Sequence, residues 1–211
     1  MKILTTRRAA LLLLAASVLP AQTKPPLVII LLGPPGCGKS TQSEKITAEF
    51  GIPGVSTGAL LRAEVAAGTP LGQRIEGDMK KGALISDEIV NDLVVARFAK
   101  PDAAPGLILD GYPRTVEQAR FLDQLLANRK SGDPLVLNFT LTKEEAIKRL
   151  GGRGRADDKP EVIVERMAVY DKETKPLLDY YAARGVRNID SIGTPEAVFE
   201  KVRAIIREAK L

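Results

Sequence analysis

The 211-residue chain has the length of one globular α/β domain and is too short for two large ones. With 45% hydrophobic and 27% charged residues, its composition excludes collagen-like and wholly disordered chains. The sequence has no histidine, which excludes a His-based catalytic triad, a His general base and a His-ligated metal. The single cysteine, Cys37, excludes an intrachain disulfide and a Cys₄ zinc cluster, so we expect no zinc site.

The formal net charge of +5 is concentrated at the N-terminus. Residues 1–26 carry four basic residues and no acidic one, which leaves a formal charge of only +1 for residues 27–211. No basic run and no strand with interleaved aromatic residues remains in that larger part. We therefore expect no nucleic-acid partner.

Residues 1–26 have the layout of a leader followed by a linker. A basic stretch, Met1–Arg8, precedes the mostly aliphatic run Ala9–Leu19, and small residues follow up to Ala21. The pair Arg7-Arg8 also resembles a twin-arginine signal. The alternatives are that residues 1–26 form a disordered N-terminal extension, or that the start of a cytoplasmic protein has been misassigned. The aliphatic run is too short to span a bilayer of about 30 Å, so we expect no stable membrane span.

Residues 27–211 are predicted to form one doubly wound α/β domain with a parallel sheet. The unbroken aliphatic run Leu27–Leu32 is typical of a strand that is buried on both faces. Similar runs recur at Gly106–Asp110, Leu135–Phe139 and Val186–Ile189, and segments with helical periodicity separate them. This alternation of strands and helices defines the fold class.

Three helical stretches lie between the first two predicted strands, at Thr57–Ala67, Pro70–Lys81 and Ser86–Phe98, and we expect no strand among them. They indicate an inserted helical subdomain. Two later helix starts are also marked in the sequence. Thr142 to Glu145 forms a capping box, and Thr194-Pro195 places a proline in the first turn of the last helix.

A phosphate-binding loop follows the first predicted strand. Residues 33–40 read Gly-Pro-Pro-Gly-Cys-Gly-Lys-Ser, which matches G-x-x-x-x-G-K-[ST], and a helix is expected at residues 41–50. The glycines allow successive backbone amides to point at phosphate, and the Lys39 ammonium can reach the β- and γ-phosphates. Ser40 is a candidate Mg²⁺ ligand. Cys37 has no base beside it in this pattern, so we expect its backbone amide to matter more than its thiol.

Phosphoryl transfer to an acceptor that is itself a phosphate needs no general base, because this nucleophile is already anionic. The protein must then offset the repulsion between two polyanions. Arginine suits this role, since its planar fork binds phosphate oxygens in pairs and stays charged. The candidates are Arg62, Arg114, Arg149, Arg153, Arg155 and Arg166.

Five separate motifs follow one another along the chain. They are residues 33–42 (GPPGCGKSTQ), 56–62 (STGALLR), 82–88 (GALISDE), 110–119 (DGYPRTVEQA) and 154–158 (GRADD). With these motifs, the chain resembles the adenylate kinases (ATP:AMP phosphotransferases) from about Leu27 to the C-terminus. The resemblance implies a P-loop NTPase-type sheet flanked by helices, with an AMP-binding helical insertion at about 56–86 and a short lid at about 150–160. It also implies the transfer of phosphate from Mg-ATP to AMP and a role in adenine nucleotide homeostasis.

The resemblance also implies which residues bind and act. Catalysis falls to Lys39, Arg114, Arg153, Arg155 and Arg166. ATP would be bound by Gly33, Gly36, Cys37, Gly38, Lys39, Ser40, Thr41, Arg149 and Gly193. AMP would be bound by Thr57, Arg62, Ala83, Leu84, Ile85, Gly111, Tyr112, Pro113, Arg114, Gln118, Arg155 and Arg166. Mg²⁺ would arrive with ATP and lie near Ser40 and Asp110, held through water.

The sequence departs from the family pattern at three places. Ala59 stands where members usually carry aspartate after Ser-Thr-Gly. The pair Ser40-Thr41 offers two hydroxyls where many members have glycine and threonine. Only sixteen residues separate Arg149 from Arg166, which leaves no room for a zinc-bearing or β-hairpin lid around Arg153.

Alternative functions stay open at this stage. A kinase for UMP or CMP would differ in its acceptor-base pocket, and Thr57 and Gln118 favour AMP over both. A P-loop protein that binds nucleotide without catalysis would not explain the two arginine-bearing acceptor motifs. The expected substrates indicate the cytoplasm, whereas the leader indicates export. We expect a monomer whose partners are ATP, AMP and ADP.

Overall fold

The computed structural model describes residues 25–155 and 158–210. The predicted leader lies outside these residues except for Pro25 and Pro26. Ala156 and Asp157 of the predicted lid also lie outside them.

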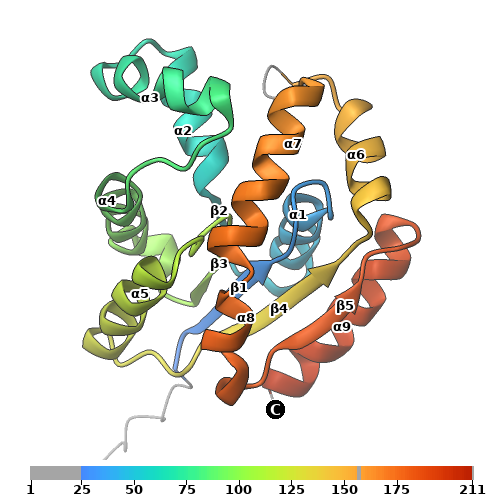
Figure 1. Ribbon diagram of the computed structural model, residues 1–211. Helices are drawn as coiled ribbons and strands as arrows, with labels where there is room; N and C mark the ends of the chain where they lie inside the picture. Colours follow the sequence, from blue (N-terminus) through green and yellow to red (C-terminus); the bar gives the residue numbers. More distant parts are fainter. Residues whose placement is uncertain (1–24, 156–157, 211) are drawn as a thin grey trace, which may run out of the picture.

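Five parallel strands form the central sheet in the order β2-β3-β1-β4-β5 (Figure 1). Strand β1 pairs with β3 on one side and with β4 on the other. The chain therefore places β2 and β3 on one side of β1 and then β4 and β5 on the other, which makes β1 the topological switch point. In such sheets ligands bind beyond the carboxyl ends of the strands at this switch point. The predicted doubly wound fold is therefore confirmed. The strands are β1 (Leu27–Leu32), β2 (Gly54–Ser56), β3 (Gly106–Asp110), β4 (Leu135–Thr140) and β5 (Arg187–Asp190).

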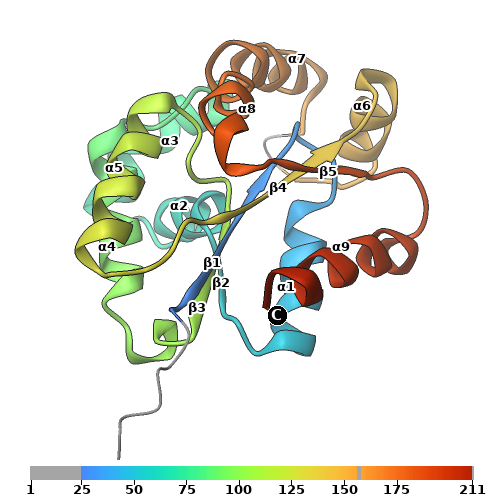
Figure 2. The same ribbon diagram turned by 90° about the horizontal axis from the view of Figure 1, so that it is seen from below.

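Helices cover both faces of the sheet because alternate residues of each central strand point to opposite sides. In β1, Ile29 and Leu31 pack with α1 (Lys39–Phe50) and α9 (Pro195–Lys210). Three further residues of β1, Val28, Ile30 and Leu32, belong to the core on the opposite side. Figure 2 shows α1 and α9 together on one side of the sheet. The helices of that second core include α4 (Asp87–Phe98), α5 (Val116–Asn128) and the single turn α8 (Leu177–Tyr180).

The short edge strand β2 precedes the three helical stretches and is not among the strands that the sequence predicts. It has three residues, too few to show an alternating pattern, and it pairs with β3 through Val55 and Leu109. Gly54 begins this strand where a Cβ would overlap Ser43 Oγ of α1. Close approach to α1 and pairing to β3 are tertiary facts, so the local sequence carries little signal for this strand.

Two pairs of helices stand above the carboxyl edge of the sheet. The expected insertion at about 56–86 spans α2 (Thr57–Ala66) and α3 (Pro70–Lys81), and the expected lid lies between α6 (Lys143–Gly151) and α7 (Pro160–Val169) (Figure 1). The π-helical turn η2 (Tyr170–Thr174) follows α7 directly. Two 3₁₀ turns, η1 (Pro101–Ala103) and η3 (Ala182–Arg184), precede β3 and β5.

Both predicted helix starts are present, one of them in altered form. Pro195 occupies the first turn of α9, as predicted. At α6, Thr142 Oγ1 accepts a hydrogen bond from the Glu145 amide at 3.3 Å, which is the first half of the capping box. The Glu145 carboxylate does not complete the box but accepts a bond from Arg149 Nε at 2.9 Å. The charged partner one turn along α6 is the stronger donor for a carboxylate.

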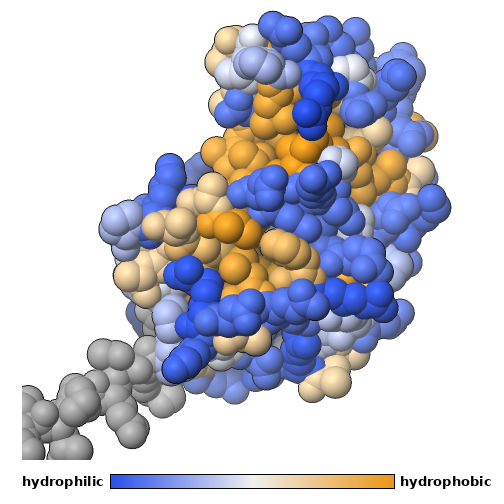
Figure 3. All heavy atoms as spheres, turned by 90° about the vertical axis from the view of Figure 1, so that its left-hand side faces the viewer, coloured by the Kyte–Doolittle hydropathy of each residue, from blue (hydrophilic) through white to orange (hydrophobic). Residues whose placement is uncertain are grey.

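The surface formed by α3, α4 and α5 carries apolar side chains that bands of polar side chains interrupt (Figure 3). The exposed large hydrophobic residues of the described chain lie on separate elements: Leu60, Val95, Ile147, Val164 and Ile192. Of the helices in the described ranges, none combines the length and the apolar composition needed to cross a bilayer.

The contact between α2 and α3 provides a matched test of packing. A Cβ on Gly72 of α3 would overlap the carbonyl oxygen of Glu64, whereas a Cβ on Gly77 of the same helix meets no atom within 4 Å. We expect Gly72→Ala to lower the free energy of unfolding by about 1–3 kcal/mol through overpacking. Gly77→Ala should raise it by up to about 1 kcal/mol, because alanine favours the helix. Urea unfolding measures both, and equal effects of the two variants would contradict this packing.

Candidate active site

A cavity of about 590 Å³ lies at the carboxyl edge of the sheet, over the switch point at β1. The phosphate loop (residues 33–40), the insertion, α6, α7 and the loop before α9 all contribute to its wall. A smaller cavity of about 70 Å³ adjoins it between the insertion and α4 and shares Arg62, Arg114 and Arg166 with it. The large cavity therefore opens into a second pocket on the insertion side.

The large cavity is strongly cationic although residues 27–211 are almost neutral. Two carboxylates, those of Asp110 and Glu145, share its wall with seven cationic side chains. Fixed positive charges that line a cleft focus the field and attract polyanions. The seven are Lys39, Arg62, Arg114, Arg149, Arg153, Arg155 and Arg166.

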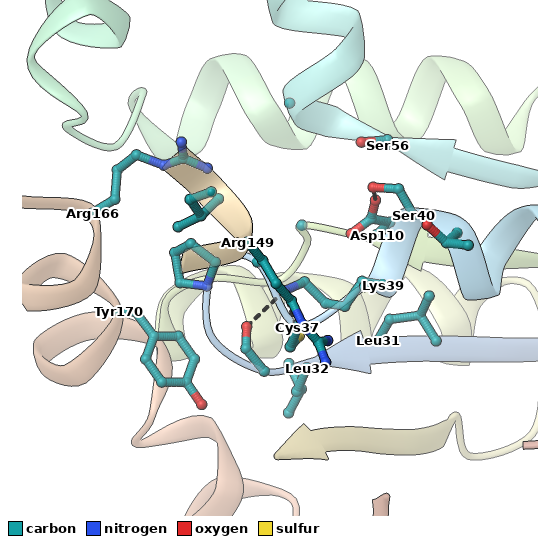
Figure 4. Close-up of a pocket in the computed structure, with 18 of the residues that line it drawn as sticks. Leu31, Leu32, Cys37, Lys39, Ser40, Ser56, Asp110, Arg149, Arg166 and Tyr170 are labelled. Atoms are coloured by element: carbon teal, nitrogen blue, oxygen red, sulfur yellow. Dashed lines mark hydrogen bonds between the residues drawn. The ribbon is translucent and has the colours of Figure 1, made fainter. Parts of the chain in front are cut away.

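The phosphate loop has the backbone that close approach to a ligand requires. Gly38 adopts a left-handed conformation (φ 90°) immediately before α1 and has open space around it. The Lys39 ammonium folds back over the loop and donates to the carbonyls of Gly33 at 2.7 Å and Pro34 at 3.0 Å (Figure 4). It also lies 3.3 Å from the sulfur of Cys37, which is buried with 2% exposure. Lys39 thus stands at the mouth of the loop, held by weak carbonyl acceptors that an anionic phosphate can replace.

Ser40 and Asp110 form a pair of oxygen groups beside the phosphate loop. The Ser40 hydroxyl donates to Asp110 Oδ2 at 2.5 Å, and the carboxylate lies at the end of β3 (Figure 4). Hydroxyl and carboxylate oxygens are the donors that Mg²⁺ prefers, so this pair fits a magnesium ion that enters with a nucleotide. Across residues 25–155 and 158–210, no group of three or more Cys, Asp or Glu side chains is placed so that it could hold a metal ion.

Arg149 is fixed at the cavity wall by two partners. Its Nε donates to Glu145 Oε1 at 2.9 Å and its Nη2 donates to the carbonyl of Ser191 at 3.2 Å. Both bonds lie in the plane of the guanidinium group, so the flat face of the group remains available for stacking. The sequence motifs single out Arg149 but not Glu145, although a spacing of four residues on a predicted helix indicates that the two side chains can meet.

The Asp158 carboxylate binds two arginines near the expected lid. It has 2% side-chain exposure and accepts two bonds from Arg153, at 2.6 and 2.9 Å, and one from Arg166 at 3.2 Å. The backbone amide of Arg155 also donates to it at 3.2 Å. Burial favours the neutral acid, but the hydrogen bonds and positive charges of its partners outweigh burial. They hold the pKa of Asp158 below its ordinary value of 3.8.

The insertion side is tied to the end of β3 by one carbonyl. Gly111 O accepts from Thr57 Oγ1 at 2.8 Å and from Arg114 Nε at 2.9 Å. Gln118, in the first turn of α5, is buried with 2% exposure. Its side-chain amide donates to Asp87 Oδ1 at 2.6 Å and accepts from the Arg114 amide at 2.7 Å.

Tyr112 is placed differently from the expectation. Its side chain is fully buried in the core and its hydroxyl donates to Asn91 Oδ1 at 2.6 Å, so it does not reach either cavity. Burial, followed by the nearby charge of Asp87, raises the pKa of Tyr112. An aromatic residue next to a functional motif gives no local sign of whether it faces the ligand or the core, and here the core helices enclose it.

The π-helical turn η2 adds a residue that the sequence did not indicate. Tyr170 lines the large cavity, and burial, followed by its neighbours Cys37 and Asp171, raises its pKa to about 12. It therefore adds no negative charge at neutral pH. Thr174 of the same turn donates to the carbonyl of Arg114 at 3.0 Å, which joins the end of α7 to the arginine-bearing motif after β3.

All the other residues expected to bind or act line one of the two cavities. The large cavity has Gly33, Gly36, Cys37, Gly38, Lys39, Ser40, Thr41, Arg149, Gly193, Pro113, Arg153 and Arg155. The small cavity has Thr57, Ala83, Ile85 and Gln118. Shared between them are Arg62, Leu84, Gly111, Arg114 and Arg166. The fold thus brings together motifs that lie up to about 160 residues apart.

The low pKa of Asp158 predicts a pH-dependent contribution to stability. A carboxyl whose folded pKa is lowered stabilises the fold above its unfolded pKa, and this stabilisation is lost as the pH falls through the folded pKa. We expect the parent to exceed Asp158→Asn in thermal midpoint at pH 6, with the difference shrinking steadily below about pH 3.8. Asp179→Asn, at an exposed position of α8, is the control and should give no such trend. A difference independent of pH would refute the assignment.

Comparisons with known proteins agree with this site. The family model described as adenylate kinase matches residues 31–186. A curated adenylate kinase of Mycolicibacterium smegmatis is 47% identical over 173 residues, which cover 82% of this chain and 95% of that protein. Adenylate kinases of Mycobacterium ulcerans and Mycobacterium tuberculosis are 46% identical over the same shares. The cationic cavity, its phosphate loop and these similarities lead to one conclusion: the chain belongs to the adenylate kinase family.

Proposed function

We propose that this chain catalyses the reversible transfer of the terminal phosphoryl group of Mg-ATP to AMP, which gives two ADP and balances the adenine nucleotides. One observation carries the proposal. The phosphate loop and the insertion face one cationic cavity from different sides, and arginines from the insertion, the motif after β3 and the lid region share that cavity. A cavity of this kind suits two nucleotides that meet at their phosphates.

On the donor side, residues 33–41 bind the ATP phosphates through backbone amides and the Lys39 ammonium. The carbonyls of Gly33 and Pro34 release Lys39 when phosphate arrives, because a charged acceptor forms the stronger bond. Arg149 stacks on the adenine of ATP, and Gly193 in the loop before α9 lines the same part of the cavity. Ser40 and Asp110 would hold Mg²⁺ through its waters, and the ion would supply positive charge to the ATP phosphates.

On the acceptor side, the small cavity takes the base of AMP, with Thr57, Gln118 and residues 83–85 around it. Arg62 and Arg114 bind the AMP phosphate at the boundary between the two cavities. The phosphate is anionic at neutral pH, so it attacks without a general base. The chain's contribution to the chemistry is positioning together with compensation of charge.

The lid arginines complete the site when the short lid closes. Arg153, Arg155 and Arg166 then surround the phosphoryl group in transfer and exclude water that would hydrolyse ATP. In this structure Asp158 holds Arg153 and Arg166 together, so these two side chains are already on the cavity wall before a nucleotide binds.

Two further features belong to this proposal. The insertion at about 56–86 and the lid at about 150–160 act as the two moving parts, and the chain acts as a monomer. The leader decides whether this activity operates in the cytoplasm or after export. N-terminal sequencing of the natural protein distinguishes a retained leader from a cleaved one.

The reaction is tested with purified protein, ATP-Mg²⁺ and one of AMP, UMP, CMP or GMP as acceptor. We expect ADP from AMP, with the three other acceptors far slower. We expect Lys39→Met to lower kcat by at least about 100-fold, since it removes a donor aimed at the transferring group. Lys45→Met, on the same helix but paired with Glu196, is the control and should keep full activity. No ADP from AMP defeats the function, and equal use of UMP or CMP defeats the acceptor assignment.

Arg149 and its partner Glu145 provide a test of the donor-base site. Glu145→Gln weakens the bond that holds the guanidinium plane, so KM for ATP should rise about 3–10-fold while KM for AMP stays within twofold. Glu144→Gln removes the same charge from an exposed neighbour in the first turn of α6 and should change neither constant. Equal shifts in the two KM values of Glu145→Gln would contradict the role.

A further inference from the structure

We infer that Asp87 is a positioning residue that fixes the orientation of the Gln118 amide and thereby selects a 6-amino purine over a 6-oxo purine as the acceptor base. The inference deepens the proposed function and rests on its assignment of the small cavity to the AMP base.

Two short hydrogen bonds hold the Gln118 side chain. Its Nε2 donates to Asp87 Oδ1 at 2.6 Å, and its Oε1 accepts from the backbone amide of Arg114 at 2.7 Å. The residue has 2% exposure and lines the small cavity. Water therefore has little access with which to replace either partner.

The polarity of both partners is fixed by their chemistry. A carboxylate only accepts hydrogen bonds, and a backbone N–H only donates them. If the Gln118 amide turned over, two acceptors would face each other at Asp87 and two donors would face each other at Arg114. An unpaired group in a buried place costs its full desolvation energy, so the amide has one stable orientation.

The fold sets the position of the Asp87 carboxylate through a second contact. Thr115 is the N-cap of α5, and its hydroxyl accepts from the Gln118 backbone amide at 3.1 Å. Its own proton is thereby directed to Asp87 Oδ2 at 3.0 Å. Both carboxylate oxygens are engaged, and the first turn of α4 is joined to the first turn of α5. The same capping interaction that begins α5 thus also holds the residue that orients Gln118.

The fixed amide leaves one N–H of Nε2 and one lone pair of Oε1 unassigned. Adenine presents a 6-amino donor next to the N1 acceptor, and this order complements an oxygen and an N–H that lie side by side. Inosine and guanine present a 6-oxo acceptor next to an N1–H donor, which is the reverse order. A glutamine that could turn over would serve both kinds of base, whereas one held by Asp87 and Arg114 serves only the 6-amino kind.

The test compares AMP with inosine 5′-monophosphate (IMP), because the two differ only at the edge in question. The full chain is assayed with ATP-Mg²⁺, and kcat and KM are measured separately for each acceptor. For Asp87→Ala we expect KM for AMP to rise about tenfold with kcat within twofold, and the AMP-to-IMP ratio of kcat/KM to fall about tenfold. Asp87→Asn still offers an oxygen to Gln118 and should keep the ratio within about threefold of the parent.

Glu88→Ala is the matched control, since it removes the same charge from an exposed position in the same helical turn. The AMP-to-IMP ratio of kcat/KM for Glu88→Ala should equal that of the parent. If Asp87→Ala does not fold, Asp87→Ser carries the same expectation, because serine suits the first turn of a helix and is too short to reach Gln118. An unchanged AMP-to-IMP ratio in the folded variant, or a fall in kcat alone, overturns the inference.

Gln118→Ala separates this inference from the proposed function. If Gln118→Ala leaves KM for AMP unchanged, the base does not bind at the small cavity and the acceptor-site assignment fails. If Gln118→Ala raises KM for AMP while Asp87→Ala keeps the parental ratio, the base site stands and only the orienting role of Asp87 fails.

Discussion

Repulsion between two polyanionic nucleotides is the physical problem on which this architecture depends. Two phosphate chains placed end to end repel each other strongly in a cavity that excludes water. The chain offsets this repulsion with seven cationic side chains in one cavity, although residues 27–211 as a whole are almost neutral. The local excess of charge, and not the total, is therefore what the fold provides.

The same cations repel one another before any nucleotide binds, and a few carboxylates hold them in place. Asp158 binds Arg153 and Arg166, and Glu145 binds Arg149. Each of these acids lies beside the arginine that it orients, so the cavity is prepared for anions without long side-chain searches on binding. The low pKa of Asp158 is the electrostatic signature of this arrangement.

On the proposed acceptor side, the direction of buried hydrogen bonds has the corresponding role. Gln118 has its donor and acceptor assigned by Asp87 and by the Arg114 amide, and Thr115 connects this pair to the start of α5. Charge thus prepares the part of the cavity proposed for phosphate, whereas the direction of buried hydrogen bonds prepares the part proposed for the base. Both depend on residues that would not themselves touch the transferring phosphoryl group.

The sequence by itself determined the parallel α/β class, four of the five strands, the helices that precede β3 and the glycine-rich loop after β1, because each rests on a local pattern of apolar residues or glycines. It also identified the arginines and Gln118 through motifs that resemble a known family. Only the tertiary structure decided that β2 is a strand, that Tyr112 belongs to the core, and that Asp87, Glu145 and Asp158 hold the binding residues. The physical reason is that strand pairing at an edge, side-chain burial and hydrogen-bond partners such as Asp87 and Gln118, which are 31 residues apart, arise from the meeting of separate elements. No local pattern in the chain encodes such a meeting.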